Sequence, residues 1–99
     1  YDRSTAARQV CIEHHGYNCI VCGFNFAAIY GAFGANYIEV HHLKQLADIS
    51  EEYQIDPIKD LRPVCANCHR MLHKERPPIS IEELQRKIHD QKFSPSIYH

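Results

Sequence analysis

Two pairs of cysteines restrict what this chain can fold into more than any other feature of its sequence. The pairs are Cys19-x-x-Cys22 and Cys65-x-x-Cys68. Thiols at this spacing can bind one ion from a tight turn, and two such pairs supply the four ligands of a tetrahedral structural zinc site. Two disulfides are the alternative, but such frameworks belong to secreted proteins, no signal peptide opens the chain, and Cys11 makes the cysteine count odd. The sequence therefore predicts a Cys₄ zinc site.

The size of the chain makes such a metal site useful for folding. With 99 residues, 44% of them hydrophobic and 23% charged, the composition is that of one globular domain spanning residues 1–99. A domain this small buries only about two-thirds of the surface of its unfolded chain, so a metal often completes its stability. The chain begins at Tyr1 rather than at Met, and we expect it to be a fragment of a longer protein.

Charge and hydropathy exclude some classes of protein without selecting a partner. The formal net charge is −1, whereas a module that coats DNA nonspecifically would be strongly basic. No apolar run approaches the roughly 20 residues that span a bilayer. We therefore expect a cytoplasmic protein of prokaryotic type that has no contact with a membrane.

The patterning along the chain predicts a small α+β fold. A strand is expected at 37–43, where β-branched residues begin to alternate, and a short edge strand at 61–64, which contains Pro63. Gly16 ends a predicted helix, and the capping box from Ser80 to Glu83 begins another. The expected helices are 4–15, 65–74 and 81–91, with one or two helical turns in 24–30, a long loop at 44–60 and a loose tail at 92–99.

Four histidines are placed where they could bind a second metal ion. His69 and His73 lie four residues apart on the helix that begins in the second cysteine pair, so both imidazoles project from one face. The doublet His41-His42 lies near the end of the predicted strand, where adjacent side chains point to opposite sides. One histidine of the doublet can therefore be a ligand while the other acts on substrate or solvent. A histidine pair alone more often reflects packing, but its position beside the cysteines and the upstream doublet favours a metal site.

These segments together resemble the HNH endonuclease family, and within it the McrA-like branch of modification-dependent restriction enzymes. The resemblance rests on Cys19-x-x-Cys22, on Ile38-Glu-Val-His-His-Leu43, and on Asp60-Leu-Arg-Pro-Val-Cys65-x-x-Cys68-His69-x-x-x-His73. It covers about residues 8–75, with a motif core at about 17–75. It implies a ββα-metal core, in which a two-stranded hairpin and a helix surround one divalent ion, braced by a separate Cys₄ zinc and flanked by N- and C-terminal helices.

The resemblance also implies roles for individual residues. His42 matches the general base of the family, and His41, His69 and His73 match the ligands of the catalytic metal. The middle residue of the motif, ordinarily asparagine, corresponds either to Asp60 or to Asn67. An ionised aspartate accepts hydrogen bonds but cannot donate one, so both residues stay open for this role.

The implied reaction is metal-dependent hydrolysis of DNA phosphodiester bonds, with 5′-phosphate and 3′-hydroxyl products. The catalytic ion would be Mg²⁺, Mn²⁺, Co²⁺, Ni²⁺ or Zn²⁺, and three imidazole ligands favour the borderline metals over Mg²⁺. The expected partner is double-stranded DNA, a homodimer would allow both strands to be cut, and the domain could serve a restriction or defence enzyme. The alternative is a non-catalytic zinc-binding module for DNA or protein.

Three basic residues near the motifs are candidates for contacts with phosphate groups, although they could equally be ordinary solvated charges. They are Arg62, Arg70 and Lys74. The aromatic side chains of Tyr30 and Tyr37 are expected in the core rather than as platforms on which bases stack.

Overall fold

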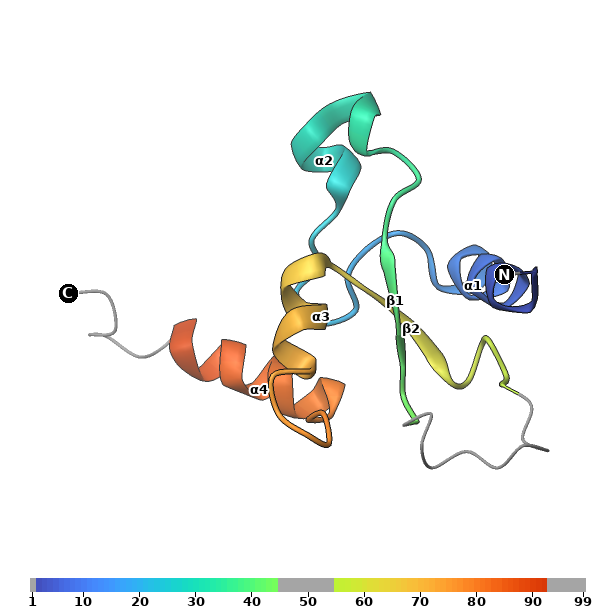
Figure 1. Cartoon of the computed structure of the whole chain (residues 1–99). Helices are drawn as coiled ribbons and strands as arrows, with labels where there is room; N and C mark the ends of the chain where they lie inside the picture. The colour runs from blue at the N-terminus through green and yellow to red at the C-terminus, as the bar shows by residue number, and fades with distance from the viewer. Residues whose placement is uncertain (1, 45–54, 93–99) are drawn as a thin grey trace.

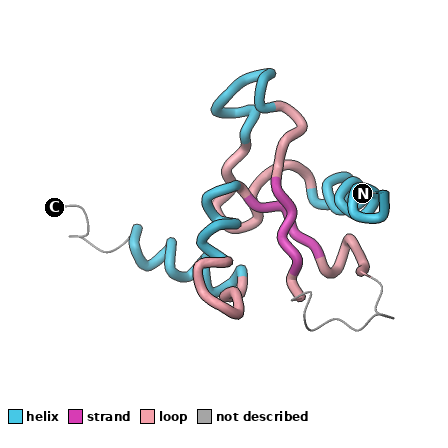
Figure 2. Tube along the Cα trace, viewed as in Figure 1, coloured by secondary structure: helices cyan, strands magenta, loops and turns pink. Residues whose placement is uncertain are grey.

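The structure, a computed structural model, describes residues 2–44 and 55–92. Its elements, in chain order, are α1 (Asp2–His15), α2 (Phe26–Tyr30), the 3₁₀ helix η1 (Gly31–Gly34), β1 (Glu39–His42), β2 (Leu61–Val64), α3 (Ala66–Leu72) and α4 (Ile81–Lys92). The predicted α+β class and the flanking helices are confirmed (Figures 1 and 2). Most of the predicted long loop and nearly all of the predicted tail lie outside the described residues. Within the described part of the chain, no helix has the length and hydropathy needed to cross a membrane.

The two strands form an antiparallel sheet at the centre of the molecule. The register pairs Glu39 with Val64 and His42 with Leu61. Figure 1 shows α1 on one side of the sheet and α3 with α4 on the other, and α1 contacts β2 while α3 contacts β1. The first strand is shorter than the predicted 37–43 because only residues 39–42 pair with β2.

Local interactions set the boundaries of the helices around the sheet. Gly16 ends α1 with a positive φ of 87°, which glycine adopts without strain. The Sγ atom of Cys65 accepts a hydrogen bond from the Cys68 amide at 3.4 Å, so the second cysteine pair itself begins α3. Ser80 caps α4, its Oγ accepting from the Glu83 amide at 3.0 Å. The predicted 65–74 helix is therefore found at 66–72, with Cys65 and His73 as its caps.

The hydrophobic core is built around the second cysteine pair. Its buried members are Cys19, Val64, Cys65, Cys68, Leu72, Ile81 and Leu84. Phe24 and Phe26 pack against this cluster from the segment that carries α2. The core therefore joins the first cysteine pair, α3 and α4, and it fixes the orientation of α3 relative to the sheet.

Candidate active site

The four cysteines of the two pairs meet in one cluster. Their Sγ atoms all lie within 4.8 Å of one another, and Cys22 is the only one of the four that is exposed. The first turn is closed by a 2.8 Å hydrogen bond from the Gly23 amide to the Cys19 carbonyl. All five cysteines of the chain are free thiols, so no disulfide joins the pairs. Four soft sulfur ligands in a compact group fit a structural zinc ion.

The protonation chemistry of these thiols depends on their burial. Burial, reinforced by the neighbouring cysteines, raises the pKa of Cys68 well above its ordinary value. Burial also raises the pKa of Cys22. Burial opposes ionisation of Cys19 as well, but backbone hydrogen bonds from Cys22 and Cys65 outweigh it and lower its pKa. Zinc bound by thiolates must displace protons from such a cluster, so its affinity rises with pH.

Three histidines form a second cluster beside the first. His41 comes from β1, and His69 and His73 come from successive turns of α3. The ring centroids lie 5.5 Å apart for His41–His69, 5.0 Å for His41–His73 and 5.1 Å for His69–His73. One nitrogen from each ring lies within 4.8 Å of the other two. The three rings can therefore offer three nitrogen ligands to one ion. His69 and His73 lie close together because they are four residues apart in the sequence, as predicted.

The environment of His41 indicates what this cluster is built to hold. Its side chain is only 3% exposed, and within the described residues its buried Nδ1 atom has no hydrogen-bond partner. Burial lowers the pKa of His41 to about 4, with smaller contributions from His73 and His69, and burial also lowers the pKa of His73. These shifts favour the neutral forms of His41 and His73, which can bind a cation. A buried nitrogen left unsatisfied costs about 1–3 kcal/mol, so a bound divalent ion of borderline type fits these residues.

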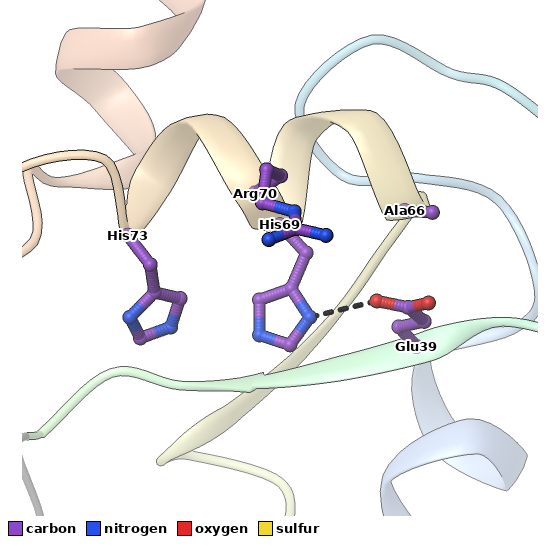
Figure 3. A pocket seen from close by; sticks show the side chains of 5 residues that line it. All are labelled: Glu39, Ala66, His69, Arg70 and His73. Atoms are coloured by element: carbon purple, nitrogen blue, oxygen red, sulfur yellow. Dashed lines mark hydrogen bonds and ion pairs between the residues drawn. The ribbon is translucent and has the colours of Figure 1, made fainter.

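Glu39 is a member of this site that the sequence motifs did not predict. Its Oε1 atom lies 2.9 Å from Nδ1 of His69, and the two side chains are 31% and 27% exposed. Figure 3 shows His69 and His73 projecting from α3 toward β1, with Glu39 reaching His69 from the strand. These three residues, with Ala66 and Arg70, line a pocket of ≈ 290 Å³. One indication of this role was present in the sequence. Side chains two residues apart in a strand point to the same side, so Glu39 is expected on the same side of the strand as His41.

The doublet histidines lie in different environments, as the alternation along a strand requires. His41 is buried within the cluster, whereas the next residue, His42, is exposed. His42 is nevertheless close enough to His41 and His73 to interact electrostatically with both rings. The site therefore has an accessible imidazole on the residue that follows its buried candidate ligand His41.

The two candidates for the middle motif position lie in different places. Asp60 is buried, and its Oδ2 accepts from the Asp56 amide at 2.9 Å. Its carbonyl accepts from the amide of Leu43, the residue after His42, at 2.8 Å. Asn67 is exposed in the first turn of α3. Asp60 thus connects the turn before β2 to the end of β1, next to His42.

The three basic candidates for phosphate contacts also differ in position. Arg70 lines the pocket beside His69 and His73. Lys74 is exposed and directly follows His73. Nη1 of Arg62 donates hydrogen bonds to the carbonyls of Ile58, Lys59 and Leu61, at 2.8, 3.2 and 2.8 Å. Arg62 therefore binds its own turn, whereas Arg70 lines the pocket that His69 and His73 also line.

The expectation that the two tyrosines lie in the core is wrong. Tyr30 is 58% exposed and Tyr37 is 46% exposed. Tyr37 instead packs edge-on against Phe26, with ring centroids 4.8 Å apart, and its hydroxyl lies 3.3 Å from Oε2 of Glu39. The segment between the cysteine pairs is thereby connected to the histidine site.

Comparison with known families agrees with this geometry. The profile of the HNH endonuclease family matches residues 19–75, which include both cysteine pairs and all four motif histidines. The chain therefore belongs to the HNH endonuclease family, and membership indicates nuclease activity that uses a divalent metal. No curated protein and no solved structure gives a significant match to this chain.

Proposed function

We propose that this chain is a metal-dependent endonuclease domain that hydrolyses phosphodiester bonds of double-stranded DNA. The observation that carries the proposal is the grouping of His41, His69 and His73 within reach of one ion, with the exposed His42 following His41 in β1. A structural module needs the cysteine cluster, but it has no use for three converging imidazoles and a fourth at the surface. The cysteine cluster, with zinc bound, would hold α3 in place.

The three ligand histidines prepare the site for an anionic substrate. Being neutral, they leave the full positive charge of a divalent ion to act on the phosphate. When bound, the ion supplies Lewis-acid stabilisation of the phosphate oxygens and of the leaving 3′ oxygen. The choice among Mg²⁺, Mn²⁺, Co²⁺, Ni²⁺ and Zn²⁺ follows ligand type, and three nitrogen ligands favour the borderline metals.

His42 acts as the general base in this proposal. Its neutral ring takes a proton from a water molecule, the water oxygen forms a bond to phosphorus, and the bond from phosphorus to the 3′ oxygen breaks. The products carry a 5′-phosphate and a 3′-hydroxyl, the latter protonated from solvent. Imidazole exchanges protons near neutral pH, and general-base assistance typically contributes about 10²–10⁴-fold in rate.

Other residues position the substrate and the base. Asp60 connects the turn before β2 to the residue that follows His42, so it serves as the middle residue of the motif. Arg70 lies on α3, Lys74 directly follows the C-cap His73, and both bind phosphates flanking the scissile bond. A dimer would bring two such sites to the two strands, as a restriction or defence enzyme of the McrA-like branch requires.

The experiment measures cleavage of supercoiled plasmid by the purified chain in Mg²⁺, Mn²⁺, Co²⁺ and Ni²⁺. We expect nicking or linearisation that His42→Ala reduces at least about 10²-fold while metal binding at the histidine cluster is retained. His14→Ala, which removes an exposed histidine from α1, is the matched control and should cleave like the wild type. Equal cleavage by His42→Ala would remove His42 from the role of base. A metal-loaded wild type that binds DNA without cutting it would support the non-catalytic module instead.

A further inference from the structure

The contact between Glu39 and His69 determines which nitrogen of His69 is available to a metal. A neutral imidazole has one N–H donor and one bare nitrogen acceptor. A carboxylate 2.9 Å from Nδ1 is satisfied only if Nδ1 carries the proton and donates it. The lone pair of His69 is then on Nε2, and this atom faces the remainder of the cluster.

We propose that Glu39 is a positioning residue for the metal site, which fixes the tautomer and the orientation of His69, and that Tyr37 in turn orients Glu39. The proposal rests on the proposed function only in taking the histidine cluster to be a metal site. Metal-binding histidines in general donate their second N–H to a carboxylate or a carbonyl, which orients the ring and increases its basicity as a ligand. Among the three histidines of this cluster, His69 has such a carboxylate partner in the structure.

Glu39 is itself held from both sides. One carboxylate oxygen accepts from His69, and the other lies 3.3 Å from the Tyr37 hydroxyl, which donates to it. Both oxygens are therefore engaged, so the carboxylate plane is fixed although the side chain is 31% exposed. With Glu39 bound in this way, His69 keeps its orientation before any ion arrives, and less conformational freedom is lost when the ion binds.

The segment between the cysteine pairs supports this arrangement. Tyr37 packs edge-on against Phe26, and Phe26 packs edge-on against Phe24, with centroids 4.8 Å apart in each pair. Phe24 and Phe26 in turn pack against the core cluster that contains Cys19, Cys65 and Cys68. A continuous series of contacts therefore leads from the cysteine cluster through the aromatic rings to Tyr37, Glu39 and His69. This gives the α2–η1 segment a function in positioning a metal ligand.

The first test reads the tautomer of His69 directly by ¹⁵N NMR, at about pH 8, where imidazole is neutral. The protein is loaded with one equivalent of zinc, which the four thiols bind in preference to the histidines. We expect His69 to be protonated at Nδ1 in the wild type and to become a mixture of the two tautomers in Glu39→Ala. Glu13→Ala, at an exposed position on α1, is the matched control. A His69 protonated at Nε2 in the wild type, or a tautomer unchanged in Glu39→Ala, would overturn the proposal.

The second test measures the affinity of the histidine cluster for Co²⁺ by calorimetry in the same zinc-loaded proteins. We expect Glu39→Ala to weaken binding about 10–100-fold, Glu39→Gln to weaken it less because an amide oxygen still accepts from Nδ1, and Tyr37→Phe to have the smallest effect. The Co²⁺ absorption bands should keep their positions in Glu39→Gln. Shifted bands would make Glu39 a direct ligand and would overturn the positioning role. Plasmid cleavage is measured separately, so a wild type that binds Co²⁺ without cutting DNA contradicts the proposed function and leaves the role of Glu39 intact.

Discussion

A single buried carboxylate organises the approach to the candidate base. Asp60 pairs with Asp56 twice, since its amide donates to the Asp56 carbonyl at 2.7 Å and its carboxylate accepts from the Asp56 amide at 2.9 Å. Its own carbonyl then holds the amide of Leu43 at 2.8 Å. These three contacts close the turn before β2 and attach it to the residue following His42. In its proposed role as the middle residue of the motif, Asp60 acts through the acceptor oxygens of its carboxylate and its carbonyl.

This acceptor role distinguishes the two candidates for the middle position of the motif. We expect Asp60→Ala to lower the free energy of unfolding by about 1–3 kcal/mol, because it leaves the Asp56 amide unpaired, and to reduce plasmid cleavage. Asp60→Asn should retain most of both, since its amide oxygen accepts equally well. Asn67→Ala, at an exposed position, should change the stability by less than about 0.5 kcal/mol. Urea unfolding and plasmid cleavage check these values. Loss of cleavage in Asn67→Ala together with an active Asp60→Ala would assign the role to Asn67.

The sequence predicted the residues of both clusters better than it predicted their supporting contacts. The cysteine pairs and the histidines at i and i+4 are recognised by their spacing in the sequence. This spacing also determines how the side chains lie in the folded chain, because each pair belongs to a single turn or a single helix with its cap. The bond between Glu39 and His69 joins residues 30 positions apart. It depends on the register of β1 against α3, which no local pattern contains. The prediction that Tyr30 and Tyr37 lie in the core was wrong for a related reason. An aromatic residue in a short segment can pack on a neighbouring ring and still face solvent.

At the scale of elements, α4 supports the helix that carries most of the candidate ligands. Ile81 and Leu84 on α4 are buried, 6% and 7% exposed, and they join the core cluster together with the fully buried Leu72 of α3. The side chain of Gln85 adds a 2.9 Å hydrogen bond to the Ile20 carbonyl within the first cysteine turn. One helix thus contacts both halves of the Cys₄ cluster. The helix that the capping box predicted at 81–91 is found at Ile81–Lys92.

Shortening one side chain on α4 tests this support. We expect Leu84→Ala to lower the free energy of unfolding by about 2–5 kcal/mol, through lost burial and the cavity left behind. Arg86→Ala, on the exposed side of the same helix, should change it by less than about 0.5 kcal/mol. Urea unfolding of the zinc-loaded proteins measures both. Similar stabilities for the two variants would show that α4 is not part of the cooperative core.

At the scale of the whole molecule, the cysteine cluster is part of the hydrophobic core, because three of its four members are buried among the core side chains. In the core cluster around the second cysteine pair, the buried aliphatic residues are Val64, Leu72, Ile81 and Leu84, and the other buried members are cysteines. Outside this cluster, Ile12, Ile38 and Leu61 are buried as well. The sheet has two strands of four residues each. An isolated hairpin of this size is marginally stable at best in water. We therefore expect an ion bound by the four thiols to stabilise the fold by joining the first cysteine turn to the segment that leads from β2 into α3.

Removal of one zinc ligand tests this dependence. Structural zinc sites contribute apparent binding free energies of about 10–16 kcal/mol in small peptides, so we expect Cys22→Ser to unfold the chain rather than only to slow catalysis. Cys11→Ala, which removes the buried thiol outside the cluster, should keep its zinc and remain folded. Zinc content, circular dichroism and thermal melting measure the difference. A Cys22→Ser protein with native spectra and a native melting transition would contradict the prediction.

The order of the candidate ligands along α3 and its caps restricts which insertions and deletions this chain can accept. Cys68 and His69 are neighbours in the sequence, yet one belongs to the sulfur cluster and the other to the nitrogen cluster. Each residue added to an α-helix rotates everything after it by about 100°. An insertion or deletion of one residue between Cys65 and His73 would turn one set of ligands away from its partners while leaving the other set in place. The length of this short stretch is therefore fixed by the geometry of two ligand clusters, whatever changes its remaining side chains accept.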